Sequence, residues 1–183
     1  MLGVFFPSFS NSYSLYGQIF LYILIFVIGV SVGANTGTLK RALKVLKKDV
    51  LLLPVFSIGG ALFGGILGGI ITGVPLKISL AVAAGLGWYS LAGPMLSLVS
   101  PMWGALAFLS NIGREILSFI LIPFMKGKKG ALIPMAMGGA TAMDTTMPMI
   151  TRFSGEEYVL GALYNGVILS MMVPILIGFI LSF

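Results

Sequence analysis

The 183-residue chain contains no cysteine and no histidine, and only 9% of its residues are charged. Without cysteine there is no disulfide framework or thiolate chemistry, and without histidine there is no Cys/His metal site and no Ser-His-Asp triad. The glycine-rich stretches contain no nucleotide-binding motif. We therefore expect neither an enzyme nor a cofactor or metal site, and the low charge content is far from the roughly one quarter that is typical of soluble domains.

Apolar residues dominate instead, at 58% of the chain with a mean hydropathy of +1.08, which indicates an integral membrane protein. A helix needs about 20 largely uncharged residues to cross the hydrocarbon core. Four runs have this length: residues 15–34, 50–72, 102–124 and 156–182. Glycines spaced four and five apart in the second run predict a close approach of another backbone. Ser154 and Glu157 form a capping-box pattern that predicts the start of the last helix.

Two further apolar segments, residues 78–99 and 131–151, are interrupted in the middle by glycine, polar residues and proline. At an offset of 54 residues, Gly85 aligns with Gly139, Ser90 with Asp144, and Pro94 with Pro148. Such matches also arise by chance in apolar sequence. Read as a repeat, they divide a single transmembrane domain, residues 1–183, into repeat A at about 78–125 and repeat B at about 131–183.

Positive charges gather in two loops, at residues 40–48 and 126–129. The positive-inside rule favours placing both in the cytoplasm, and this requires each broken segment to enter and return as a re-entrant hairpin. The fold class expected is thus an all-α membrane protein with about four transmembrane helices plus two re-entrant hairpins in an inverted repeat, with both termini outside. Because these charges sit in short clusters between apolar runs, no nucleic-acid partner is expected.

Two of the five acidic residues, Glu115 and Asp144, fall inside apolar segments. An ionisable side chain at membrane depth costs about 2.5–3.5 kcal/mol on insertion scales, so it usually marks a transport pathway. Asn111 lies one helical turn before Glu115 on the same face. Arg114 is adjacent to Glu115 and points about 100° away from it, so it is poorly placed to pair with that acid but can bind something across the bundle.

The aromatic pair Trp88 and Tyr89 is open to two readings, an anchor at the membrane interface or the lining of a cavity at the first break. Hydroxyl groups lie near both breaks. The candidate substrate- or ion-binding residues are therefore Glu115, Asp144, Asn111, Arg114, Ser90, Trp88, Tyr89, Thr141 and Thr145.

Four stretches, "GLGWYSLAGP", "NIGREILSFILIP", "GGATAMDTTMPMI" and "GVILSMMVPILIGFILS", resemble the LysO-type L-lysine exporters. The resemblance runs from the first span to the C-terminus. It implies export of L-lysine across a prokaryotic cytoplasmic membrane and a pair of intramembrane acids needed for transport, matched here by Glu115 and Asp144. Full-length members carry about a hundred more residues before this region, so a homo-oligomer or a separately encoded small membrane subunit is expected to complete the protein.

The function predicted is a secondary transporter that exports L-lysine in exchange for protons or another cation, with membrane lipid as its surroundings. The ammonium groups of lysine suit the two carboxylates, and its carboxylate suits the positive ends of half-helices. Either acid can instead carry the coupling ion. Two alternatives remain open: a cation/proton antiporter with no amino-acid substrate, and a membrane subunit or protease that transports nothing.

Overall fold

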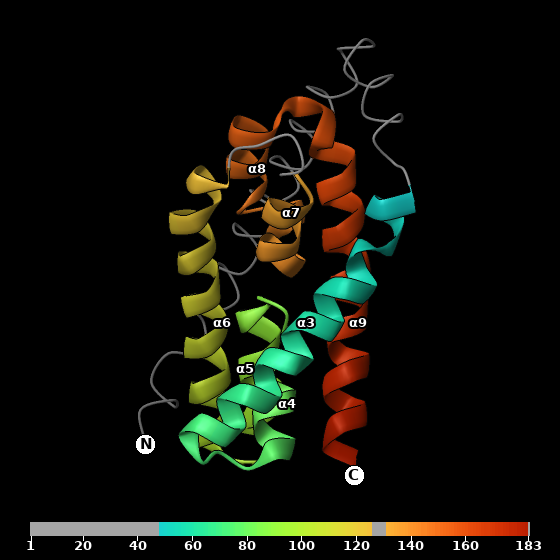
Figure 1. Cartoon of the computed structure of the whole chain (residues 1–183). Coiled ribbons are helices and arrows are strands. Elements are labelled where there is room, and N and C mark those ends of the chain that lie inside the picture. Colours follow the sequence, from blue (N-terminus) through green and yellow to red (C-terminus); the bar gives the residue numbers. More distant parts are fainter. Residues whose placement is uncertain (1–47, 126–130, 183) are drawn as a thin grey trace, which may run out of the picture. The chain divides into compact units, whose positions relative to one another are not determined.

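The computed structural model describes residues 48–125 and 131–182, and all of their regular elements are helices (Figure 1). In chain order these are α3 (Lys48–Thr72), α4 (Leu76–Ala83), α5 (Tyr89–Ser97), α6 (Pro101–Leu121), η1 (Ile122–Phe124), α7 (Leu132–Gly138), η2 (Gly139–Met143), α8 (Met147–Ser154), η3 (Glu156–Tyr158) and α9 (Val159–Ser182). The first predicted span, residues 15–34, and most of the two basic loops lie outside the described residues.

Three stretches of the described residues are long and apolar enough to cross a membrane: Lys48–Thr72, Pro101–Phe124 and Glu156–Ser182. Their mean hydropathies are 2.2, 1.6 and 2.0. At 1.5 Å per residue each is about 36 Å or longer, against a hydrocarbon core of about 30 Å. The predictions for residues 50–72, 102–124 and 156–182 are therefore confirmed as helices of spanning length.

The two segments predicted to be broken are both broken. α4 and α5 have 8 and 9 residues, and α7 and α8 have 7 and 8. Each is about 10–14 Å long and cannot cross a membrane by itself. In Figure 1, α4 and α5 lie together near one end of α6, whereas α7 and α8 lie near its other end. Each broken segment thus has its own end of this helical bundle.

Small residues bring the first broken segment close to its neighbours. A Cβ atom added to Gly65 of α3 would lie 2.7 Å from the Cβ of Ala83, and one at Gly104 of α6 would lie 2.9 Å from the carbonyl oxygen of Gly93. These contacts explain why glycine occupies both positions, since any side chain would push the helices apart. The predicted close approach along the glycine-rich span is confirmed, and its partner is α4.

The predicted capping box is wrong. Ser154 ends α8, and Gly155 follows with a φ angle of 117° that side chains rarely adopt. The 3₁₀ turn η3 then leads into α9 without a side-chain cap. The polar cluster therefore reverses the chain between two helices, because the left-handed glycine ends the first helix before Ser154 can begin the next.

Candidate functional site at the two helix breaks

The two breaks meet inside the protein. The backbone N–H of Ala140, in the second break, donates a hydrogen bond of 2.9 Å to the carbonyl oxygen of Leu86 in the first. Leu86 is fully buried and has a φ angle of 49°, which is rare for a residue with a side chain. Gly139 beside it has a φ of 62°. Unusual backbone on both sides of one contact marks this junction as a place where the surroundings hold strain.

Asn111 of α6 hydrogen-bonds to the backbone of the first break. Its Oδ1 accepts a hydrogen bond of 2.8 Å from the N–H of Gly87, and its Nδ2 donates to the carbonyl oxygens of Val82 and Ala107. The side chain is 3% exposed. A helix that stops in an apolar interior leaves backbone groups without partners. Asn111 supplies the acceptor for the N–H of Gly87 and a second donor for the carbonyl of Val82, which also accepts from the N–H of Gly85.

Arg114 and Ser118, further along α6, serve the second break in the same way. Arg114 Nη2 donates to the carbonyl oxygen of Ala136 at 3.2 Å, and the Ser118 hydroxyl lies 2.8 Å from the carbonyl oxygen of Met137. These carbonyls belong to the C-terminal end of α7, where a positive charge is favourable. Arg114 thus does bind across the bundle, as its position on α6 allowed, and its partner is a helix end.

The two acids approach one another around a single hydroxyl group. Thr145 Oγ1 donates a hydrogen bond to Glu115 Oε1 and lies 3.4 Å from Asp144 Oδ1. Asp144 Oδ1 also accepts a hydrogen bond of 2.6 Å from the backbone N–H of Thr145. A hydroxyl has one proton and can donate fully to only one carboxylate. The second break thus brings together the carboxylate of Glu115, from α6, and that of Asp144, from the turn before α8, beside an exposed threonine.

Asp144 also has a structural reading. It lies three residues before the first residue of α8, and its backbone carbonyl accepts a hydrogen bond of 3.2 Å from Met147. An acid near a helix N-terminus is stabilising because of the helix dipole. Glu115 lies in the middle of α6 and has no such role, so the pair is not explained by helix capping alone.

The side chains of the remaining predicted residues make no hydrogen bond to either carboxylate in the described part of the chain. Trp88 is half-buried and packs against the core around α4 and α5, and the Tyr89 ring contacts Phe108 of α6 edge to face at 5.5 Å. Ser90 is exposed on the first turn of α5. Thr141 is buried and donates to the carbonyl oxygen of Gly138 at 2.8 Å, within its own turn. Among the described residues, the link between these four and the acids is a backbone one, from the N–H of Asp144 to the carbonyl oxygen of Thr141 at 3.1 Å.

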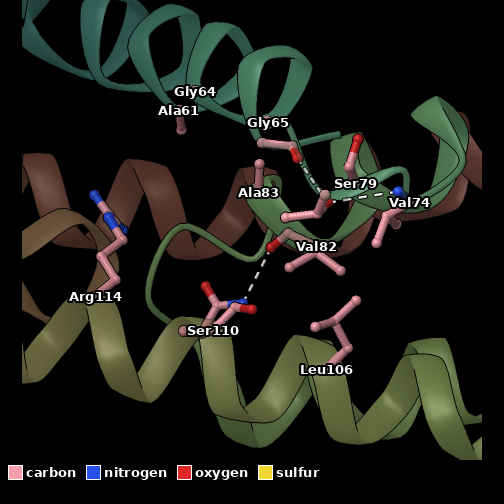
Figure 2. A pocket seen from close by; sticks show the side chains of 13 residues that line it. Ala61, Gly64, Gly65, Val74, Ser79, Val82, Ala83, Leu106, Ser110 and Arg114 are labelled. Atoms are coloured by element: carbon pink, nitrogen blue, oxygen red, sulfur yellow. Dashed lines mark hydrogen bonds between the residues drawn. The ribbon is translucent and has the colours of Figure 1, made fainter. Parts of the chain in front are cut away.

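A cavity of about 450 Å³ lies beside the end of α4, next to the first break (Figure 2). Its walls come from α3, α4 and α6. Three glycines of α3 line one wall, Val82 and Ala83 of α4 line the next, and Arg114 and Asn111 contribute the polar part. Glu115 and Asp144 are not among its lining residues.

Residues 1–181 match the family described as lysine exporter LysO. The chain belongs to the lysine exporter LysO family. It is 36% identical over 160 residues to the lysine exporter LysO of Escherichia coli, in an alignment that covers 87% of this chain and 52% of that protein. It is 35% identical over 180 residues to a putative lysine exporter of Haemophilus influenzae, covering 97% of this chain and 87% of the relative. The chain therefore spans about half the length of the Escherichia coli relative. No solved structure matches it.

In this LysO family member three structural residues escaped the sequence interpretation. Ser118 and Asn165 are buried polar residues that bind the α7 carbonyls, the latter through a bond of 3.0 Å from its Nδ2 to Met135. A polar residue in an apolar helix was the available signal for both. Leu86 carried no signal, because its unusual backbone angle depends on contacts with the other break.

Proposed function

We propose that this LysO family member is a secondary transporter that exports L-lysine across the cytoplasmic membrane of a prokaryotic cell, and that Glu115 and Asp144 bind the cation. The observation that carries the proposal is the approach of the two carboxylates around the Thr145 hydroxyl. The two relatives named as lysine exporters support lysine as the substrate.

Two carboxylates served by few donors favour a positively charged ligand. The two charged carboxylates repel each other, and the single hydroxyl between them does not neutralise their charge. An ammonium group of lysine has three donors and satisfies both acids at once. A coupling proton or another cation relieves the same repulsion when lysine has left, so alternate occupation by substrate and coupling ion gives exchange.

The architecture that we propose for transport is an inverted repeat of about residues 78–125 and 131–183, with each broken segment re-entering the membrane from its own side. The contact between the two breaks and their short half-helices support it. Discontinuous helices that meet near the midplane are typical of substrate sites in secondary transporters. A second copy or a small membrane subunit would complete the surface around this site.

The test is lysine efflux from proteoliposomes that contain Glu115→Gln or Asp144→Asn. Each change removes a charge and keeps the size and the ability to hydrogen-bond, so insertion and folding should persist while efflux falls at least about a hundredfold. Glu156→Gln and Glu157→Gln are matched controls, because these acids lie in η3, away from the breaks. Near-normal efflux by either site variant would show that its carboxylate is structural.

The rival cation/proton antiporter uses the same two acids and is separated by its substrate. Counterflow of radiolabelled lysine in vesicles that contain this chain alone, with and without competing sodium, distinguishes the two. Sodium or proton exchange without lysine counterflow would replace the lysine proposal.

A further inference from the structure

The cavity between α3, α4 and α6 is not explained by the acid pair. Its volume of about 450 Å³ lies within the range of small-molecule sites, roughly 300–1,000 Å³. Aliphatic side chains and glycines form most of the walls, including Val82, Leu106 and Gly64. Such walls suit a hydrocarbon chain. Figure 2 shows the Arg114 side chain leaving α6 and extending toward α3, at one end of the cavity.

Arg114 has an unused donor at this position. Its Nη2 is bonded to Ala136, but its Nη1 is buried and has no hydrogen-bond partner in the described part of the chain. A buried charged donor without a partner is costly. The adjacent Glu115 does not relieve it, because that carboxylate is directed to Thr145. The guanidinium group therefore lacks an anionic partner beside an apolar cavity.

We infer that this cavity is a binding subsite for an aliphatic carboxylate, with Arg114 Nη1 as its charged donor. The inference rests on the proposed function in one respect, since it identifies the ligand group as the α-carboxylate of the exported amino acid. A carboxylate matches the planar guanidinium, and the hydrocarbon part of the ligand matches the walls. Nη1 is enclosed beside Gly87 and Gly139 at the junction, so contact with a ligand requires the guanidinium to move toward the cavity that its side chain already lines.

The subsite makes the carboxylate a requirement for tight binding. Lysine should bind about ten- to a hundredfold more tightly than 1,5-diaminopentane, which has two amino groups and no carboxylate, because the latter leaves Arg114 unpaired. L-Norleucine keeps the carboxylate and the α-ammonium group but replaces the side-chain ammonium with a methyl group. It should therefore bind at the subsite even though it cannot satisfy both acids.

The glycines of α3 provide a matched pair of variants. Gly64 lines the cavity and Gly60, one turn earlier on the same helix face, does not. Nothing in the described residues lies within 4 Å of a Cβ atom added at either position. A leucine at position 64 leans toward the helix N-terminus and into the part of the cavity near Ala61, so Gly64→Leu should block the subsite without disturbing the breaks. Gly60→Leu controls for the added apolar side chain.

The experiment measures binding of the three probes to the purified full chain by calorimetry, together with lysine counterflow. We expect Gly64→Leu to weaken the binding of lysine and of norleucine at least tenfold, and Gly60→Leu to leave both affinities unchanged. Neither variant should change the affinity for 1,5-diaminopentane. If the parent chain binds lysine and the diamine equally well, and the two variants have the same affinities, the subsite is overturned and the lysine-export proposal is unaffected. Norleucine binding that Gly64→Leu abolishes, in a chain without lysine counterflow, would support the subsite and contradict the proposed function. An absence of any probe binding would overturn both.

Discussion

Replacement of Asn111 by leucine should destabilise this protein because it releases the first helix break. The side chain accepts from the N–H of Gly87 and donates to the carbonyl of Val82, and both bonds span more than 20 residues of sequence. Leucine has a similar volume and no hydrogen-bonding group. The third partner, the carbonyl of Ala107, lies one turn back on α6 itself. Asn111→Leu therefore leaves the N–H of Gly87 without an acceptor and creates little empty space. It also removes one donor to the carbonyl of Val82, which keeps its bond from the N–H of Gly85.

The magnitude follows mainly from the N–H of Gly87. A buried donor that loses its partner costs about 1–3 kcal/mol and the lost bond to Val82 adds about 0.5–1.5 kcal/mol, so the expected loss in free energy of unfolding is about 1.5–4.5 kcal/mol. Asn165→Leu is the comparison, since Asn165 makes one bond to Met135 and its Oδ1 has no partner in the described residues. That change removes one of the two donors to the Met135 carbonyl, which keeps its bond from the N–H of Gly139, and it removes one unpaired oxygen. It should cost less than half as much as Asn111→Leu.

Reversible unfolding in mixed detergent micelles, followed by circular dichroism, measures both variants. The reasoning fails if Asn111→Leu is within about 0.5 kcal/mol of the parent, or if Asn165→Leu is the more damaging change. A large loss for Asn111→Leu with lysine binding intact in the folded fraction would assign Asn111 to holding the break rather than to contacting substrate.

Further predictions concern the junction and the topology. Thr145→Val should reduce lysine efflux at least about tenfold because it removes the hydroxyl between the acids, whereas Thr145→Ser should retain it, and equal efflux by the two would contradict the bridging role. Gly139→Ala should cost at least about 2 kcal/mol in unfolding experiments, since the left-handed backbone disfavours alanine and its Cβ would overlap the Leu86 carbonyl. A cysteine introduced at Ser12 should react with a membrane-impermeant label added outside intact cells, whereas one at Gly127 should react only from the cytoplasmic side. External labelling at Gly127 would refute the re-entrant arrangement.

The spanning helices and the breaks were predictable because their signals are local. A run of about 20 apolar residues can hardly be anything other than a membrane-crossing helix, and α3, α6 and α9 follow the predicted spans within a few residues. Proline, glycine and polar residues in the middle of two such runs likewise indicated discontinuities. The capping box failed because a local pattern at Ser154 competed with the left-handed Gly155, and the glycine ended the helix.

The sequence by itself determined that this chain belongs in a membrane, where its helices are interrupted, and that Glu115 and Asp144 are its two unusual acids. Only the tertiary structure decided what those residues contact. The hydrogen bonds from Thr145 to Glu115, from Gly87 to Asn111, from Arg114 to Ala136 and from Ala140 to Leu86 all join residues that are 22 to 54 positions apart. Hydrophobic pattern reports whether a residue prefers lipid or water, which is a property of one segment. Hydrogen-bond partners of a broken helix depend on which other helix reaches it, and that is settled by packing.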